Sequence, residues 1–231
     1  MKNATSANRS GLSPLRRLSR DRLGTTAIEF ALVFVLFFVF VFGIIEYALM
    51  MWRWNSAETA TQMAARLAVQ SDPVSGGFNS YSGVADAGLG PGQSITWADV
   101  AAFTVTCSSD GTDVTCSGSG LPAGFTAAPD AEGIVTFDNV VTEIQKLLPT
   151  VTEQNVIVEY SHIGLGFAGR PGTDIVPLVT VRLTDLQFDF IILDIFLSVL
   201  RGPGGAAVTD SITMPAFTAS LTGEDLDTSG I

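Results

Sequence analysis

The strongest constraint on this chain is a long apolar run near its N-terminus. Residues 30–45 are sixteen consecutive residues without a charge, and the run is flanked by Glu29 and Glu46. The mostly apolar stretch over residues 25–51 forms a helix of about 40 Å at about 1.5 Å per residue, and a bilayer core is about 30 Å thick. We therefore predict one transmembrane helix over residues 25–51.

A cleaved secretory signal is the main alternative for such a run. The apolar region of a signal peptide is normally about 7–15 residues long and ends in a small-x-small cleavage site. This run is longer, and Glu46, Tyr47 and Trp52 follow it. The sequence therefore favours a retained membrane helix, with no cleavage behind the run.

Charge is distributed unevenly on the two sides of the run. Residues 1–24 carry six basic residues and one acidic residue, whereas the rest of the chain carries six basic and 22 acidic residues, which gives the net charge of −11. A basic segment before a membrane helix is retained in the cytoplasm. We expect an acidic periplasmic remainder, and an acidic surface disfavours nucleic-acid binding. The leader charges are Arg16, Arg17, Arg20 and Arg22.

The chain divides into four predicted segments. A cytoplasmic basic leader covers residues 1–24 and the transmembrane helix residues 25–51. The same helix is predicted to continue outside the membrane over residues 52–70, because no Pro or Gly interrupts it before Pro73. A periplasmic domain covers residues 71–231. Four large side chains near the membrane boundary are interpreted either as an interfacial belt or as core residues: Met50, Met51, Trp52 and Trp54.

The periplasmic segment is predicted to be an α+β domain in which antiparallel strands pack on the long helix. A hairpin is expected within residues 103–117, and a helix capped by Asp138 is expected to end at Pro149. Three apolar runs suggest strands, over residues 155–162, 177–190 and 212–218, with Pro215 marking an edge or a bulge. Residues 191–200 read as an amphipathic helix against the sheet or the membrane face.

Cys107 and Cys116 are the only cysteines, and in an oxidising compartment such a pair is usually a disulfide. A two-residue Gly111-Thr112 loop of type II′ pairs Cys107 with Cys116. The alternative Asp110-Gly111 turn pairs Cys107 with Val114 and leaves the bridge skewed. A metal site needs more ligands than these two cysteines and the lone His162, so no metal is expected there.

Motifs of the common enzyme classes are missing from the sequence. It contains no phosphate-binding loop, no HExxH, no GxSxG elbow and no GxGxxG after a strand. A catalytic triad would have to use His162, which lies in an apolar, strand-like segment. Three aspartates, Asp185, Asp189 and Asp194, lack the spacing of an EF-hand loop. We expect no enzymatic activity and no cofactor, while a calcium site built from scattered loop carboxylates stays open.

One short motif lies where the basic leader meets the apolar run. Glu29 is five residues after Gly24, and an isolated carboxylate at the edge of hydrocarbon is costly unless it has a role. The segment GTTAIEF resembles a type IV prepilin processing site, in the Gly-x-x-x-x-Glu-Phe/Tyr form of Flp-type pilins and pseudopilins. The continuation, from EFALVF through GIIEYALMM to MAARLA, resembles the N-terminus of TadE-like proteins of the tight adherence (Tad) pilus system. This resemblance covers about 50 residues.

The resemblance implies a minor pseudopilin of a Tad-type pilus or secretion system, with a pilin-like α+β fold. A prepilin peptidase would cut after Gly24 and leave Thr25 as the new N-terminus. Glu29 and Phe30 would serve recognition and assembly, with the carboxylate meeting the terminal amine of a neighbouring subunit. The implied partners are the peptidase, other pilins and pseudopilins, inner-membrane assembly proteins and the lipid bilayer. The implied location is the inner membrane, in a single pass with the N-terminus in the cytoplasm.

Two other classes of protein compete with this interpretation. The first is an uncleaved, membrane-anchored periplasmic binding or scaffold protein, in which Glu29 extends toward the lipid headgroups. The second is an anchored hydrolase, which the missing motifs disfavour. The pairing of Gly24 with Glu29 distinguishes the pseudopilin from both.

Overall fold

The computed structural model describes residues 22–201 and 211–223. Its contacts group the chain into two units, the first containing the chain up to Ala48 together with Ile191–Val208, and the second containing Leu49–Phe190 and Thr209–Ile231. Helix α2 (Arg22–Ala68) contributes to both units. It begins three residues before the predicted start at Thr25 and ends close to the predicted stop. Arg16, Arg17 and Arg20 of the predicted leader lie outside the described residues.

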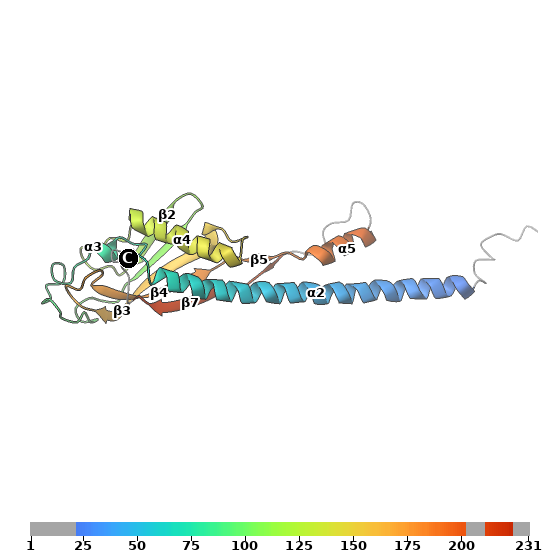
Figure 1. Cartoon of the computed structure of the whole chain (residues 1–231), viewed down its shortest axis with the longest axis horizontal. Coiled ribbons are helices and arrows are strands. Elements are labelled where there is room, and N and C mark those ends of the chain that lie inside the picture. Colours follow the sequence, from blue (N-terminus) through green and yellow to red (C-terminus); the bar gives the residue numbers. More distant parts are fainter. Residues whose placement is uncertain (1–21, 202–210, 224–231) are drawn as a thin grey trace, which may run out of the picture. The chain divides into compact units, whose positions relative to one another are not determined.

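The second unit is built around a five-stranded antiparallel sheet (Figure 1). The strand order is β2-β1-β3-β4-β7, so β2 and β7 form the edges. A long helix followed by an antiparallel sheet confirms the predicted α+β class. The strands of this sheet are β1 (Thr104–Ser109), β2 (Val114–Ser119), β3 (Val156–Gly166), β4 (Ile175–Leu183) and β7 (Phe217–Thr222). The other elements of the unit are α3 (Gly77–Ser80), α4 (Ala131–Leu147), the 3-10 turn η1 (Glu153–Asn155), β5 (Gln187–Phe188) and β6 (Ile212–Thr213).

One face of this sheet forms the core with α4 and the second half of α2. Strand β3 alternates buried and half-buried residues, which places Val158 and Tyr160 on the core face. Helix α2 meets the core through small side chains that are fully buried and allow a close approach to the sheet: Ala57, Ala60, Ala64, Ala65 and Ala68. Helix α4 contributes Phe137, Val140, Val141 and Ile144.

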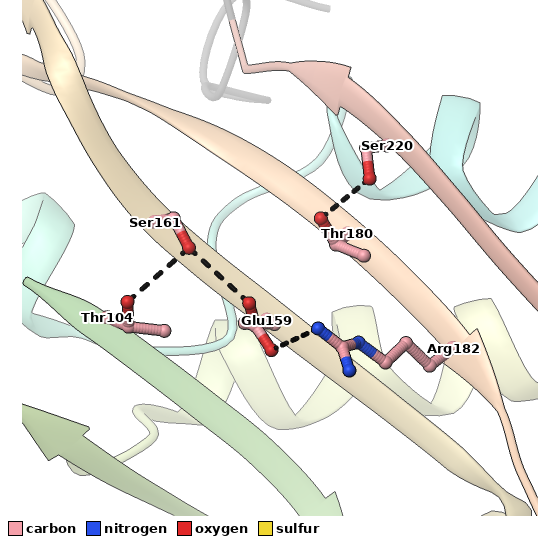
Figure 2. Close-up of polar contacts among 6 residues, drawn as sticks. All are labelled: Thr104, Glu159, Ser161, Thr180, Arg182 and Ser220. Atoms are coloured by element: carbon pink, nitrogen blue, oxygen red, sulfur yellow. Dashed lines mark hydrogen bonds and ion pairs between the residues drawn. The ribbon is translucent and has the colours of Figure 1, made fainter.

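The opposite face of the sheet carries the polar contacts that Figure 2 shows. A salt bridge joins Arg182 on β4 to Glu159 on β3 at 3.0 Å. The hydroxyl groups of Thr180 and Ser220 hydrogen-bond across β4 and β7 at 2.8 Å. Because alternate residues of a strand point to opposite faces, the same alternation that buries Val158 brings these polar groups together.

The disulfide-linked hairpin is confirmed. Strands β1 and β2 pair antiparallel with Cys107 opposite Cys116, and the two sulfur atoms are bonded. Gly111 has φ = 94°, and the Asp110 N–H donates to the Asp113 carbonyl at 3.3 Å. Positive φ at the first loop residue alone fits the predicted type II′ turn. The alternative pairing of Cys107 with Val114 is therefore wrong.

Helix α4 begins earlier than predicted. Its cap is Asp130, whose carboxylate accepts a hydrogen bond from the Gly133 N–H at 2.7 Å, whereas Asp138 lies inside the helix. The sequence did not reveal this start of α4, because glycine has a low helix propensity and Gly133 lies in the first turn. A tertiary contact requires glycine at this position, because a Cβ on residue 133 would lie 2.2 Å from the Val74 carbonyl oxygen.

The alternating run over residues 177–190 is divided between two sheets, where a single strand was predicted. Strand β4 ends at Leu183, and β5 pairs with β6 in a separate two-stranded sheet. Asp185 lies between them with φ = 56°, a conformation that ends an extended strand. The run over residues 212–218 is likewise divided, with Pro215 between β6 and β7.

The four large side chains near residue 50 do not act as one set. Met50 and Trp54 pack against the core, where the Trp54 ring lies 5.0 Å from that of Phe217. Trp52 and Met51 are exposed. The core interpretation is therefore confirmed for Met50 and Trp54, whereas the interfacial belt stays a prediction for Met51 and Trp52, which lie on a different side of the helix.

His162 is a buried core residue on β3. Its ring stacks on Phe103 with a centroid separation of 5.5 Å. Burial lowers the pKa of this imidazole below its ordinary value, because the charged form is poorly solvated there. The ring is therefore neutral near pH 7.

We predict that Gly133→Ala destabilises the protein. Alanine normally gains about 1 kcal/mol over glycine inside a helix. Overpacking costs about 1–3 kcal/mol, and here the clash is with backbone that is held in place, since the Val74 N–H donates to the Tyr160 hydroxyl. Urea unfolding should show a net loss. Gly90→Ala, where a Cβ meets only ordinary contact at 3.8 Å, should change the free energy of unfolding by less than about 0.5 kcal/mol. Equal effects of the two substitutions would contradict the close approach.

We predict that His162 makes the fold sensitive to acid. The unfolded chain binds a proton near pH 6.5, whereas burial lowers the pKa in the folded state, so stability falls as the pH drops below about 6.5. His162→Phe keeps a flat ring beside Phe103 and cannot be protonated. Denaturant unfolding at pH 7.5 and pH 5 should show a smaller loss in this variant than in the wild type, and equal losses would refute the role of His162.

Candidate functional site

The predicted processing bond lies at the start of helix α2. Gly24 and Thr25 fall within the first turn of a helix that begins at Arg22. The Gly24–Thr25 peptide therefore lies at the described start of α2, on the N-terminal side of the apolar run.

Glu29 and Phe30 lie one turn further along, and both are exposed on the helix surface. Two salt bridges join side chains of the described residues, Lys146–Glu143 and Arg182–Glu159, and neither involves Glu29. The carboxylate of Glu29 thus lies at the edge of the apolar run with its surface open to a partner outside the described chain.

A stripe of phenylalanine rings follows Glu29 along α2. Phe30, Phe34, Phe38 and Phe42 recur every four residues, and successive ring centroids are 5.6, 4.5 and 5.4 Å apart. Residues four apart lie on the same side of a helix, one turn above each other. The next position of this series is Glu46, so the stripe of rings ends at a carboxylate.

Helix α5 (Ile191–Arg201) packs against the far half of this stripe, and Figure 1 shows the two helices side by side. The Phe196 ring lies 5.0 Å from that of Phe42 and 6.2 Å from that of Phe38. Glu46 accepts a hydrogen bond from the backbone N–H of Ile192, in the first turn of α5. Only 2% of the Glu46 surface is exposed. The amphipathic helix over residues 191–200 is confirmed, and its partner within the first unit is α2.

Sequence reasoning missed Glu46 as a site residue. The same cost that singles out Glu29, an isolated carboxylate beside hydrocarbon, applies at Glu46. Its spacing of four from Phe42 was visible in the sequence. Its partner was not, because the Ile192 N–H is 146 residues away along the chain.

Among the described residues, no group of three or more His, Cys, Asp or Glu side chains is arranged to hold a metal ion. A surface depression of about 410 Å³ beside Leu165 and Phe167 has Arg170 as its charged lining residue and is lined by no carboxylate, cysteine or histidine. It therefore lacks a nucleophile with an adjacent base.

Helix α2 is long and apolar enough to cross a membrane. Its stretch over Thr26–Ala68 contains a window with a mean hydropathy of 2.9, none of which is buried within the protein. Such a helix suits a membrane anchor, because a soluble core helix would have its apolar surface covered.

Comparison with known proteins identifies the same segment. Residues 24–66 match the family model described as TadE-like protein. The match begins at Gly24, contains Glu29, Phe30 and the phenylalanine stripe, and ends near the C-terminus of α2. It confirms the resemblance found from the motif, and the TadE-like family implies a protein associated with the Tad pilus. Neither the curated proteins nor the solved structures gave a significant match to the chain.

Proposed function

We propose that this TadE-like chain is a minor pseudopilin of a Tad-type pilus or secretion system, and that a prepilin peptidase cuts it after Gly24. The observation that carries the proposal is the exposed Glu29 carboxylate, five residues after Gly24 on an apolar helix that is matched by the family model. A plain anchor needs neither the glycine nor the carboxylate.

The position of Gly24 supports processing. A peptidase must draw the scissile bond into an extended conformation, so the surrounding helix must open locally. Gly24 tolerates conformations that other residues avoid, which lowers the cost of opening the helix around the scissile bond. Cutting there would leave an ammonium group on Thr25, one helical turn from Glu29.

The exposure of Glu29 supports a role in assembly. A carboxylate in hydrocarbon strongly favours a partner of opposite charge. The new terminal amine of a neighbouring subunit would supply that charge. Because a charge pair in a low-dielectric medium is sensitive to distance, the contact would set the axial register between subunits.

The charge distribution supports an orientation with the N-terminus in the cytoplasm, because a basic leader is retained there. The second unit would then lie in the periplasm. The Cys107–Cys116 disulfide supports this, since disulfides persist in oxidising compartments. The partners would be the peptidase, other pilins and pseudopilins, and inner-membrane assembly proteins. The subunit itself would be non-enzymatic, in keeping with the missing motifs.

We predict that co-expression with the prepilin peptidase yields a mature protein beginning at Thr25. Intact-mass measurement and N-terminal sequencing would detect the loss of residues 1–24. Gly24→Leu should block the cut, because a bulky side chain restricts the backbone at the scissile bond. Gly43→Leu is the matched control on the same helix, since a Cβ at Gly43 meets no atom within 4 Å. A mature chain that retains its leader, or cleavage of Gly24→Leu at the normal rate, would leave only the anchored periplasmic protein.

We predict that Glu29→Ala is cleaved normally but assembles poorly. Removing the carboxylate leaves the neighbouring amine unpaired in hydrocarbon. A loss of about 1.4 kcal/mol corresponds to a tenfold weaker association, and an unpaired buried charge costs more than that. Co-purification with other pilus subunits should fall by at least about tenfold. Glu58→Ala, which removes an exposed carboxylate beyond the apolar run, should assemble like the wild type. Equal assembly by both variants would rule out the pairing.

A further inference from the structure

Helix α5 lies at the same depth as the apolar run of α2. Ile192 is level with Glu46, and Phe196 is level with Phe38 and Phe42. Moving along α5 thus leads back toward the N-terminus of α2, so the two helices run antiparallel. If this half of α2 lies in the membrane, α5 therefore lies in it at the same depth.

The length of the apolar run limits where the edge of the membrane can lie along α2. Residues 30–45 cover about 24 Å, already less than the hydrocarbon thickness of about 30 Å. If the membrane ended below Phe38 so that α5 stayed in water, residues 30–37 would remain, and these cover only about 12 Å. The part of α2 that contacts α5 must therefore lie within hydrocarbon if α2 spans the bilayer.

We propose that α5 is embedded in the periplasmic leaflet of the inner membrane, beside α2, with lipid acyl chains covering its outer surface. This rests on the membrane anchoring that is part of the proposed function. Its eleven residues are about 16 Å long, too short to cross the bilayer, and its first turns carry the exposed isoleucines that the proposal assigns to lipid. The chain would then contact the bilayer through two helices of different length, of which only α2 crosses it.

The exposed surface of α5 fits acyl chains. Ile191 and Ile195 are 57% and 60% exposed, although both are large and apolar. The Ser198 hydroxyl donates to the Ile195 carbonyl at 2.7 Å, so this polar group is satisfied within the helix. Asp194 lies in the first turn, near the level of Glu46 and the headgroups. An acidic residue there also interacts favourably with the helix dipole.

Lipid is a better occupant of this surface than a second protein. On α2 at the same depth, Phe40 and Ile44 are exposed to a similar extent, and these side chains belong to the run that meets lipid. The exposed isoleucines of α5 continue that surface. Acyl chains cover such a surface wherever it lies in the leaflet, whereas a protein partner would need a complementary shape.

Glu46 would position α5 at this depth. The first N–H groups of a helix have no internal partner, and within a bilayer an unsatisfied N–H is costly. The Glu46 carboxylate accepts from the Ile192 N–H at the point where α5 would enter the leaflet. This hydrogen bond thus gives the Ile192 N–H an acceptor and the buried Glu46 carboxylate a donor. Either group would be costly in the bilayer without a partner.

The test places a nitroxide spin label at Ile195→Cys in the full chain, reconstituted into vesicles of phosphatidylethanolamine and phosphatidylglycerol. Cys107 and Cys116 are bonded to each other, so neither takes the label. Collision rates with oxygen, which concentrates in hydrocarbon, and with a water-soluble nickel chelate report the depth. Ile44→Cys, on the exposed face of the apolar run, is the lipid control, and Glu58→Cys, further along the same helix, is the water control.

We expect the Ile195 label to resemble the Ile44 label, with oxygen collisions exceeding nickel collisions. A water-like signal at residue 195 beside a lipid-like signal at residue 44 would overturn the proposal while leaving the anchor intact. Protection from both reagents would also overturn it and would indicate a second protein copy over α5. A water-like signal at both positions would contradict the membrane anchor, and with it the proposed function.

A second pair of variants tests the role of Glu46 in the labelled chain. Glu46→Gln keeps an oxygen that accepts from the Ile192 N–H, whereas Glu46→Leu keeps the bulk and loses the acceptor. Glu46→Leu should shift the Ile195 label toward the water-like signal, and Glu46→Gln should leave it within error of the parent. An unchanged signal in Glu46→Leu would overturn the positioning role of Glu46.

Discussion

Two carboxylates on one apolar helix impose the constraint on which the rest of the molecule depends. A charge beside hydrocarbon needs a partner, and the two carboxylates of α2 differ in where that partner lies. Glu46 is buried and accepts from the first turn of α5, so its partner is internal. Glu29 is exposed and takes part in neither of the ion pairs between described side chains. The difference suits an intramolecular role for Glu46 and an intermolecular role for Glu29.

The same helix changes its side-chain chemistry along its length. Up to Ala48 the helix carries mostly large apolar side chains. From Ala57 onward, one side of the helix consists of alanines that are buried against the sheet. Small side chains let the helix backbone approach the strands closely, and bulky chains present a wide surface to lipid or to other helices. A continuous helix thereby serves two environments, because only its side chains change and its backbone hydrogen bonds are satisfied throughout.

Structural features that depend on residues close together in the sequence could be predicted from it. The pairing of Cys107 with Cys116 followed from a two-residue turn at Gly111, because hairpin register is set by the loop. The start of α4 could not be found in the same way. Gly133 argues against a helix on propensity, and the reason for its presence is the carbonyl of Val74, far away in the sequence. The docking of α5 was also hidden, since an apolar face does not reveal what it packs against.

The phenylalanine stripe runs from Glu29 to the contact with α5. Phe30 and Phe34 are exposed beside Glu29, whereas Phe38 and Phe42 are half-buried next to Phe196. If neighbouring subunits associate through α2, as the proposed function requires, α5 already occupies the distal half of the stripe. A neighbour would then contact the proximal half, where the charge of Glu29 lies. A subunit whose phenylalanine stripe is open to neighbours only along its proximal half would suit a terminal or initiating position in a filament better than a repeated internal one.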